Sequence, residues 1–204
     1  MPSEVADLGL QFVAVSITLY SADACPYCVR TRLVLNGKGI EYDLVQVDLS
    51  DKPAWLRELN PRNRVPVLDV DGQVLWESEA LNDYLDETHP EPAMMPSDPA
   101  ERARVRMVLR RFEDLTDAFY AARRDEEGAI EALHAELQWM SSQLEDSDYL
   151  VGDSYTLAEP GVWPWITRLY RVGVDIGQYP AIAAWCDRLA ERPEYAAELS
   201  LLAA

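Results

Sequence analysis

Two cysteines separated by two residues, Cys25 and Cys28, are the side chains of this 204-residue chain best suited to chemistry. They lie in the stretch SADACPYCVRTRL, which follows an apolar run and precedes a helical pattern. Structural zinc sites, redox disulfides and single activated thiolates all use this spacing. The remainder of the chain has to distinguish these three chemistries.

Zinc is the weakest of the three interpretations. Cys186 is the only other cysteine, and His89 and His134 are the only histidines. None of them is spaced like a zinc ligand, so we expect no metal. Three cysteines are also too few for the disulfide framework of a secreted protein, which favours a reducing compartment.

The charge of the chain excludes some partners. The formal net charge is −18, with 36 acidic against 18 basic residues, and such a surface repels phosphate backbones and anionic membranes. We therefore expect no nucleic-acid and no membrane partner. The opening MPSEVADLGLQFVAVSI has acids where a signal peptide needs basic residues, and it has no apolar run that could span a bilayer. A cytoplasmic protein is the expectation.

The predicted elements place the cysteines at the junction of a strand and a helix. VSITLYS (15–21) is a β-branched run typical of a buried strand, and the helical spacing after it ends at Gly37 and Gly39. IEYDLVQVDL (40–49) alternates apolar and polar residues like a second strand. Strand, helix and strand with short connections predict a parallel pair.

The following segments complete one domain and begin another. RVPVLDV and QVLWES predict two strands joined by Asp71-Gly72, and a helix begins at Ser78. Residues 15–88 therefore predict an α/β domain of βαβ-ββα order, the thioredoxin-like arrangement. A proline-rich linker (89–98) leads to an all-helical domain (99–204). Two apolar stripes mark its first helices: Val105, Leu109, Phe112, Leu115 and Phe119, then Ile130, Leu133, Leu137, Met140 and Leu144.

Cys25 falls where the first predicted helix begins. Free backbone N–H groups and the helix dipole favour an anion at this end of a helix. A thiol there ionises readily, with a pKa between about 3.5 and 7.5. Pro26 suits the first turn because it has no N–H to leave unpaired. We expect Cys25 to be the exposed, activated sulfur and Cys28, one turn inside, a less accessible thiol able to resolve a mixed disulfide.

The loop NPRNRVPVL (60–68) supplies a second part of the site. Its Val65-Pro66 bond is compatible with the cis form, which would turn the N–H and C=O of Val65 outward. An extended peptide could then pair with Val65 like an added strand. An ordinary trans proline at the start of a strand is the alternative.

Three further residues could bind a charged ligand. Ser78 has two interpretations: it is only the N-cap of its helix, or its hydroxyl and the nearby N–H groups bind a carboxylate. In the second interpretation Glu77 binds an ammonium group. One α-amino-acid head group satisfies both residues. Lys52 is either an anchor for a second carboxylate or a solvated surface residue. A peptide with a thiol between two carboxylate ends and one free ammonium is glutathione, the expected co-substrate.

These motifs resemble a known family. CPYCVRTRL, DKPAWLRELNP, VPVL and ES, in this order, are similar to the N-terminal domain of cytosolic glutathione transferases, most of all the omega class, whose catalytic residue is a cysteine. GDSYTLAEPGVWPW resembles the family's capping box, with Thr156 as N-cap and Glu159 three residues on. The resemblance implies a homodimer, Cys25 as catalytic residue, and four glutathione ligands: Lys52, Val65, Glu77 and Ser78.

The leading functional hypothesis is a glutathione-dependent thiol transferase and reductase acting through the Cys25 thiolate, and the resemblance adds dehydroascorbate reduction. Omega members have one cysteine in this motif. Cys28 makes it a glutaredoxin-like CPYC motif and leaves monothiol and dithiol cycles open. Two alternatives remain. One is a transferase that conjugates glutathione to electrophiles with the hydroxyl of Tyr20 or Ser21, and the other is a non-enzymatic regulator with the same fold.

Overall fold

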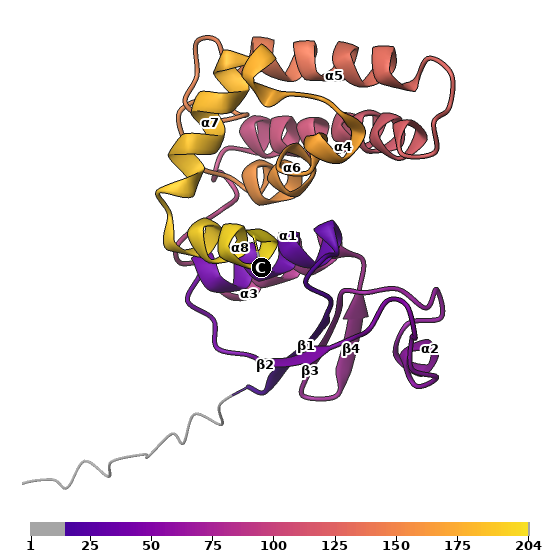
Figure 1. Cartoon of the computed structure of the whole chain (residues 1–204). Helices are drawn as coiled ribbons and strands as arrows, with labels where there is room; N and C mark the ends of the chain where they lie inside the picture. Colours follow the sequence, from indigo (N-terminus) through magenta and orange to yellow (C-terminus); the bar gives the residue numbers. More distant parts are fainter. Residues whose placement is uncertain (1–14, 204) are drawn as a thin grey trace, which may run out of the picture.

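The structure is a computed structural model that describes residues 15–203 (Figure 1). Most of the N-terminal segment used for the signal-peptide prediction lies outside the described residues. Among the described helices, none combines the length and the apolar composition needed to cross a membrane.

A four-stranded sheet forms the N-terminal half. Its strands are β1 (Ile17–Ser21), β2 (Asp43–Gln46), β3 (Val67–Val70) and β4 (Gln73–Trp76), in the order β2-β1-β3-β4. Helix α1 (Pro26–Gly37) connects β1 to β2, which pair in parallel, and the other two pairs are antiparallel. The sheet confirms the predicted βαβ-ββα order and the thioredoxin-like arrangement.

Local turn chemistry accounts for the hairpin between β3 and β4. Asp71 and Gly72 have φ values of 50° and 87°, and a two-residue turn with both values positive matches the twist of the paired strands. Between β2 and β3 the chain adds a short helix, α2 (Leu56–Leu59), which sequence analysis did not predict. One turn is too short to give a helical period.

Helix α3 (Ser78–Thr88) begins where predicted, but its cap differs from the prediction. The N-cap residue is Glu77, with φ 76°, and Ser78 is the first helical residue. Neither forms a side-chain hydrogen bond that caps the helix. Of the two alternatives for Ser78, the one in which it is only the N-cap is therefore wrong.

The C-terminal half is helical, as predicted. The apolar stripe of the first long helix is confirmed, whereas Ile130, at the start of the second, is 36% exposed. Thr156 and Glu159 make the predicted reciprocal contacts. Thr156 Oγ1 accepts from the N–H of Ala158 at 3.1 Å, and Glu159 Oε2 accepts from the N–H of Thr156 at 2.7 Å, although the helix is capped one residue later at Leu157. The helical elements are α4 (Pro99–Ala122), α5 (Ala129–Gln143), α6 (Ala158–Ile166), η1 (Leu169–Val172), η2 (Ile176–Gln178), α7 (Pro180–Ala190) and α8 (Pro193–Ala203).

Helix α1 is held between the sheet and the helical half (Figure 1). The chain returns at its end, so that α8 lies beside α1, and Arg32 of α1 binds both carboxylate oxygens of Glu198 at 2.6 Å. On α6, the carbonyl of Gly161 accepts from Arg30 Nε at 2.6 Å. These contacts fix the helix whose first turn carries the cysteines. We retain the division into residues 15–88, 89–98 and 99–204 as a proposal.

Candidate active site

Cys25 is the N-cap residue of α1, and its sulfur opens onto a cleft. Its φ and ψ of −82° and 116° are those of a chain entering a helix, and Pro26 follows in the first turn. Sγ lies 4.0 Å from the carbonyl oxygen of Val65. The residue is only 9% exposed, so the expectation of an exposed sulfur is wrong. The residue packs in a small apolar cluster with Ala22, Val65 and Val67, and it also lines a cleft.

The two sulfurs of the motif have opposite electrostatic environments. A hydrogen bond from the Cys28 thiol, assisted by the N–H groups of Cys28 and Tyr27 and by the charge of Arg168, outweighs burial and lowers the pKa of Cys25 to about 6. Complete burial, together with the neighbouring Cys25, raises the pKa of Cys28 well above its ordinary value. Cys28 Sγ also accepts from the N–H of Ala22 at 3.4 Å. At neutral pH Cys25 is therefore a thiolate and Cys28 a thiol that donates to it.

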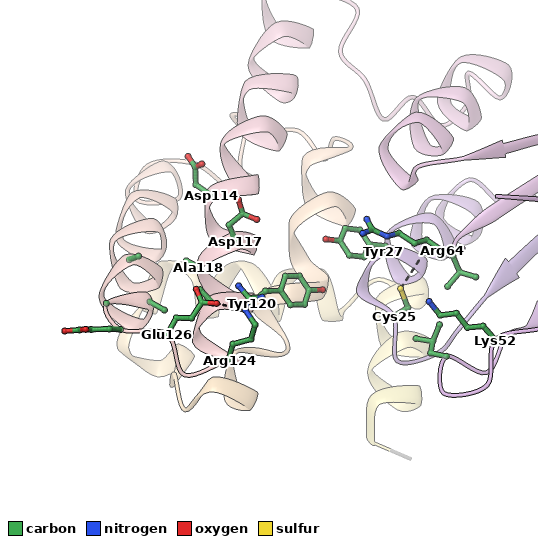
Figure 2. Close-up of a pocket in the computed structure, with 17 residues that line it drawn as sticks. Cys25, Tyr27, Lys52, Arg64, Asp114, Asp117, Ala118, Tyr120, Arg124 and Glu126 are labelled. Atoms are coloured by element: carbon green, nitrogen blue, oxygen red, sulfur yellow. Dashed lines mark hydrogen bonds and ion pairs between the residues drawn. The ribbon is translucent and has the colours of Figure 1, made fainter. Parts of the chain in front are cut away.

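The cleft at Cys25 lies between the two halves of the chain and has a volume of 860 Å³ (Figure 2). Lys52 lines it on the side of the sheet, where its Nζ donates to the carbonyl of Asn63 at 3.0 Å. Val65 lines it too, and the Val65-Pro66 bond is cis, as the loop sequence allowed. Tyr120 reaches the same cleft from α4.

An adjoining cleft of 550 Å³ contains the other two predicted ligands, Glu77 and Ser78. Four residues line both clefts: Tyr27, Arg64, Val65 and Asp117. The predicted site residues, except the buried Cys28, therefore line two connected clefts. Ser78 is 6% exposed. The Glu77 carboxylate forms an ion pair with Arg62 at 2.5 Å, and both side chains are about half exposed. The first N–H groups of α3 have no partners within the helix, and such free N–H groups favour the binding of an anion.

Several residues of the site were not identified from the sequence. Arg62 and Arg64 lie in the loop before Pro66. Their position next to this proline was a signal in the sequence that could have identified them. Asp117 comes from α4, and Arg168 follows α6. These two residues gave no local signal, because they reach the site only through the packing of the helical half on α1.

Several other aromatic and thiol side chains line neither cleft. Trp163 and Trp165 are buried in the core, whereas Tyr170 is exposed. Cys186 is half-buried against the core, and burial raises its pKa to about 12. Within residues 15–203, no group of three or more His, Cys, Asp or Glu side chains is placed to hold a metal ion.

The chain is similar to proteins of known class along most of its length. Residues 19–93 match the family described as "Glutathione S-transferase, N-terminal domain", and residues 99–188 match "Glutathione S-transferase, C-terminal domain". Glutathione S-transferase omega-1 of Sus scrofa is 32% identical over 191 residues, which cover 89% of this chain and 79% of that protein. Omega-2 of Homo sapiens is 32% identical over 195 residues, covering 90% and 80%.

Solved structures share the architecture. A glutathione transferase homologue from Sulfitobacter, whose structure contains bound glutathione, aligns with a TM-score of 0.81 and 26% identity over 90% of this chain and 96% of the other. The fold, a thioredoxin-like half followed by a helical half, and these similarities define an enzyme of the glutathione transferase class. The chain belongs to the glutathione S-transferase family, and the relatives named above are of its omega class.

Proposed function

We propose that the protein is a glutathione-dependent thiol transferase and reductase whose nucleophile is Cys25. One observation carries this proposal: the sulfur is held as a thiolate, with a pKa of about 6, at the mouth of a cleft between the two halves of the chain. A thiolate is the form that attacks disulfides, and a pKa close to ambient pH gives a useful compromise between ionisation and nucleophilicity.

The reaction follows from this placement. The Cys25 thiolate attacks the glutathione sulfur of a mixed disulfide, the S–S bond breaks, and its electron pair leaves with the other half as a thiolate. Cys25 is then joined to glutathione. The thiolate of a second glutathione attacks that disulfide, releases oxidised glutathione and restores Cys25. Each turnover consumes one free glutathione, because the other half of the oxidised glutathione comes from the mixed disulfide itself. Dehydroascorbate reduction begins differently: the Cys25 thiolate adds to a carbonyl carbon, and a glutathione thiolate then attacks the sulfur of this adduct. The C–S bond breaks, its electron pair leaves with ascorbate, and Cys25 is joined to glutathione, which a second glutathione removes as oxidised glutathione.

The clefts offer groups that match the charges of glutathione. Ser78 and the first N–H groups of α3 suit one carboxylate, and Lys52 suits the other. Glu77 suits the ammonium, because its exposed pair with Arg62 contributes little and is easily exchanged. The Val65 N–H has no hydrogen-bond partner among residues 15–203, and its carbonyl faces Cys25, so both can pair with an extended peptide.

The alternative chemistries have less support. A hydroxyl-type conjugating transferase would use Tyr20 or Ser21. Ser21 is fully buried and its hydroxyl accepts from Arg32 at 2.8 Å, while the ring of Tyr20 packs against Trp55. A purely regulatory protein would have no need for an ionised thiol that opens onto a cleft.

Turnover of the mixed disulfide formed from glutathione and 2-hydroxyethyl disulfide tests the proposal. Cys25→Ser should abolish it without unfolding the chain, and Cys186→Ser, the matched control in α7, should leave it unchanged. Mass spectrometry after treatment with oxidised glutathione should show one added glutathione on Cys25. Substantial turnover by Cys25→Ser would show that another group is the nucleophile.

A further inference from the structure

The two walls of the cleft at Cys25 carry opposite charges (Figure 2). The wall from the thioredoxin-like half contributes Lys52 and Arg64 and no carboxylate. The wall from the helical half contributes one guanidinium, which pairs with Glu126 at 2.6 Å, and four carboxylates. The charged residues of this acidic wall are Asp114, Asp117, Arg124, Glu126 and Glu127.

The acidic wall has groups that suit a cation. Asp114 and Asp117 form no ion pair within residues 15–203, although the chain contains many arginines. Tyr120 follows Asp117 by three residues, so the two side chains lie on the same face of α4, and its ring can receive a cation. Neighbouring small residues leave space beside them: Ala118, Ala121, Gly128, Ala129 and Ala132.

A second feature is the position of Cys25. The residue is 9% exposed, and it lines the cleft that the acidic wall borders. A disulfide that this sulfur attacks extends away from the sulfur in two directions, so one half can lie along each wall. Glutathione has one net negative charge at neutral pH, which matches the wall of Lys52 and Arg64. The leaving half then faces the acidic wall.

We infer that the second substrate is a disulfide whose non-glutathione half is cationic, such as the mixed disulfide of glutathione with an aminothiol. This inference rests on the proposed function and assigns Asp114 and Asp117 as residues that determine specificity. When Cys25 takes the glutathionyl group, the aminothiol leaves as a thiolate with its ammonium near these two carboxylates. The two carboxylates stabilise the positive charge of the ammonium while the electron pair leaves with the sulfur of the aminothiol.

Three mixed disulfides of glutathione test the inference. They carry cysteamine (cationic), 2-mercaptoethanol (neutral) or 3-mercaptopropionate (anionic). Each kcat/KM is divided by the rate of the uncatalysed exchange with glutathione, because leaving thiols of different pKa react at different rates. At low salt we expect a corrected preference of about tenfold for cysteamine over 3-mercaptopropionate, as two exposed carboxylates each give a few-fold effect. The preference should largely disappear at about 0.5 M salt.

Two double variants distinguish an effect of the acidic wall from an effect of the net charge of the chain. Asp114→Asn with Asp117→Asn should reduce the corrected preference to about twofold. Asp146→Asn with Asp153→Asn removes the same charge at exposed positions that line neither cleft, and should keep the preference of the original protein. Equal loss in both double variants would assign the effect to net charge and overturn the inference. So would equal corrected rates for the three disulfides. If none of them is turned over, the proposed function itself fails.

Discussion

At the scale of single residues, the CPYC motif is an asymmetric pair. Cys25 borders a cleft and is ionised, whereas Cys28 is completely buried, stays protonated and donates a hydrogen bond to Cys25. We therefore propose that the main role of Cys28 in the resting protein is to stabilise the charge on its neighbour. Whether it also takes part in turnover is a separate question, because both sulfurs lie within reach of one disulfide.

The reactivity of Cys25 should follow its ionisation. In a Cys186→Ser background, alkylation by iodoacetamide should increase through about pH 6 and level off above it, because the lowered pKa makes the thiolate dominant there. Cys28→Ala removes the strongest stabilising hydrogen bond and should move the midpoint upward. One hydrogen bond to a charged group is worth roughly 1.5–3 kcal/mol, which corresponds to about one to two pH units. A midpoint that does not move, measured by intact mass, would contradict the assigned role of Cys28.

The catalytic cycle should be mainly monothiol. Bound glutathione has a high local concentration beside Cys25 and competes with the buried Cys28 for the mixed disulfide. Cys28→Ser should keep about half or more of the turnover on glutathionylated substrates, since its hydroxyl can still donate to Cys25. It should lose Cys25 faster under peroxide, because no internal disulfide can protect that sulfur from overoxidation. If Cys28→Ser is as inactive as Cys25→Ser, the cycle is dithiol.

At the scale of elements, we propose that the start of α3 is the anion-binding end of the site. Ser78→Ala should weaken glutathione binding by roughly 1–3 kcal/mol, because the hydroxyl is nearly buried and would bind a charged group. Glu77→Ala should cost less, up to about 1 kcal/mol, because its carboxylate is half exposed and shared with Arg62. Calorimetric titration measures both. Unchanged affinity in both variants would restrict this pair of residues to a structural role.

Helix α8 supports α1 through a buried ion pair. Arg32 and Glu198 are each 3% exposed, and Arg32 also donates to Ser21 at the end of β1. Glu198→Ala leaves a buried guanidinium without its carboxylate, so the free energy of unfolding should fall by about 3–5 kcal/mol. Asp148→Ala, which removes a more exposed pair with Arg188, should cost less than about 1 kcal/mol. Urea unfolding measures both, and equal losses would show that burial of the pair is unimportant.

At the scale of the whole molecule, we propose a homodimer in which the thioredoxin-like half of one chain faces the helical half of the other. Trp76 on β4 and Met107 on α4 are large apolar side chains exposed to solvent, 37% and 68%, and such surfaces favour association. Light scattering at micromolar concentration should give twice the chain mass of 23.1 kDa. Met107→Asp should shift the mass toward the monomer, whereas Leu201→Asp, exposed on α8, should not. A monomer mass for the original protein would end the proposal.

Much of the first half could be predicted because its signals are local. A strand, a helix start with Pro26 and an alternating second strand need only a few neighbouring residues to be recognised. The Asp71-Gly72 turn has the two positive φ values that its residue types allow. The position of Cys25 at the start of a helix therefore followed from sequence alone, and with it the expectation of an acidic thiol.

Only the tertiary structure decided what surrounds that thiol. The burial of Cys25, the ion pair of Glu77 with Arg62 and the charge of Arg168 near the sulfur depend on side chains that meet through packing. Asp117 and Tyr120 are about ninety residues from Cys25 along the chain, and on α4 they look like any exposed acid and half-buried aromatic. Periodicity gives the face of a helix on which a residue lies, but not the surface that this face meets. That surface is fixed by the packing of α4 and α6 against α1, which no local pattern encodes.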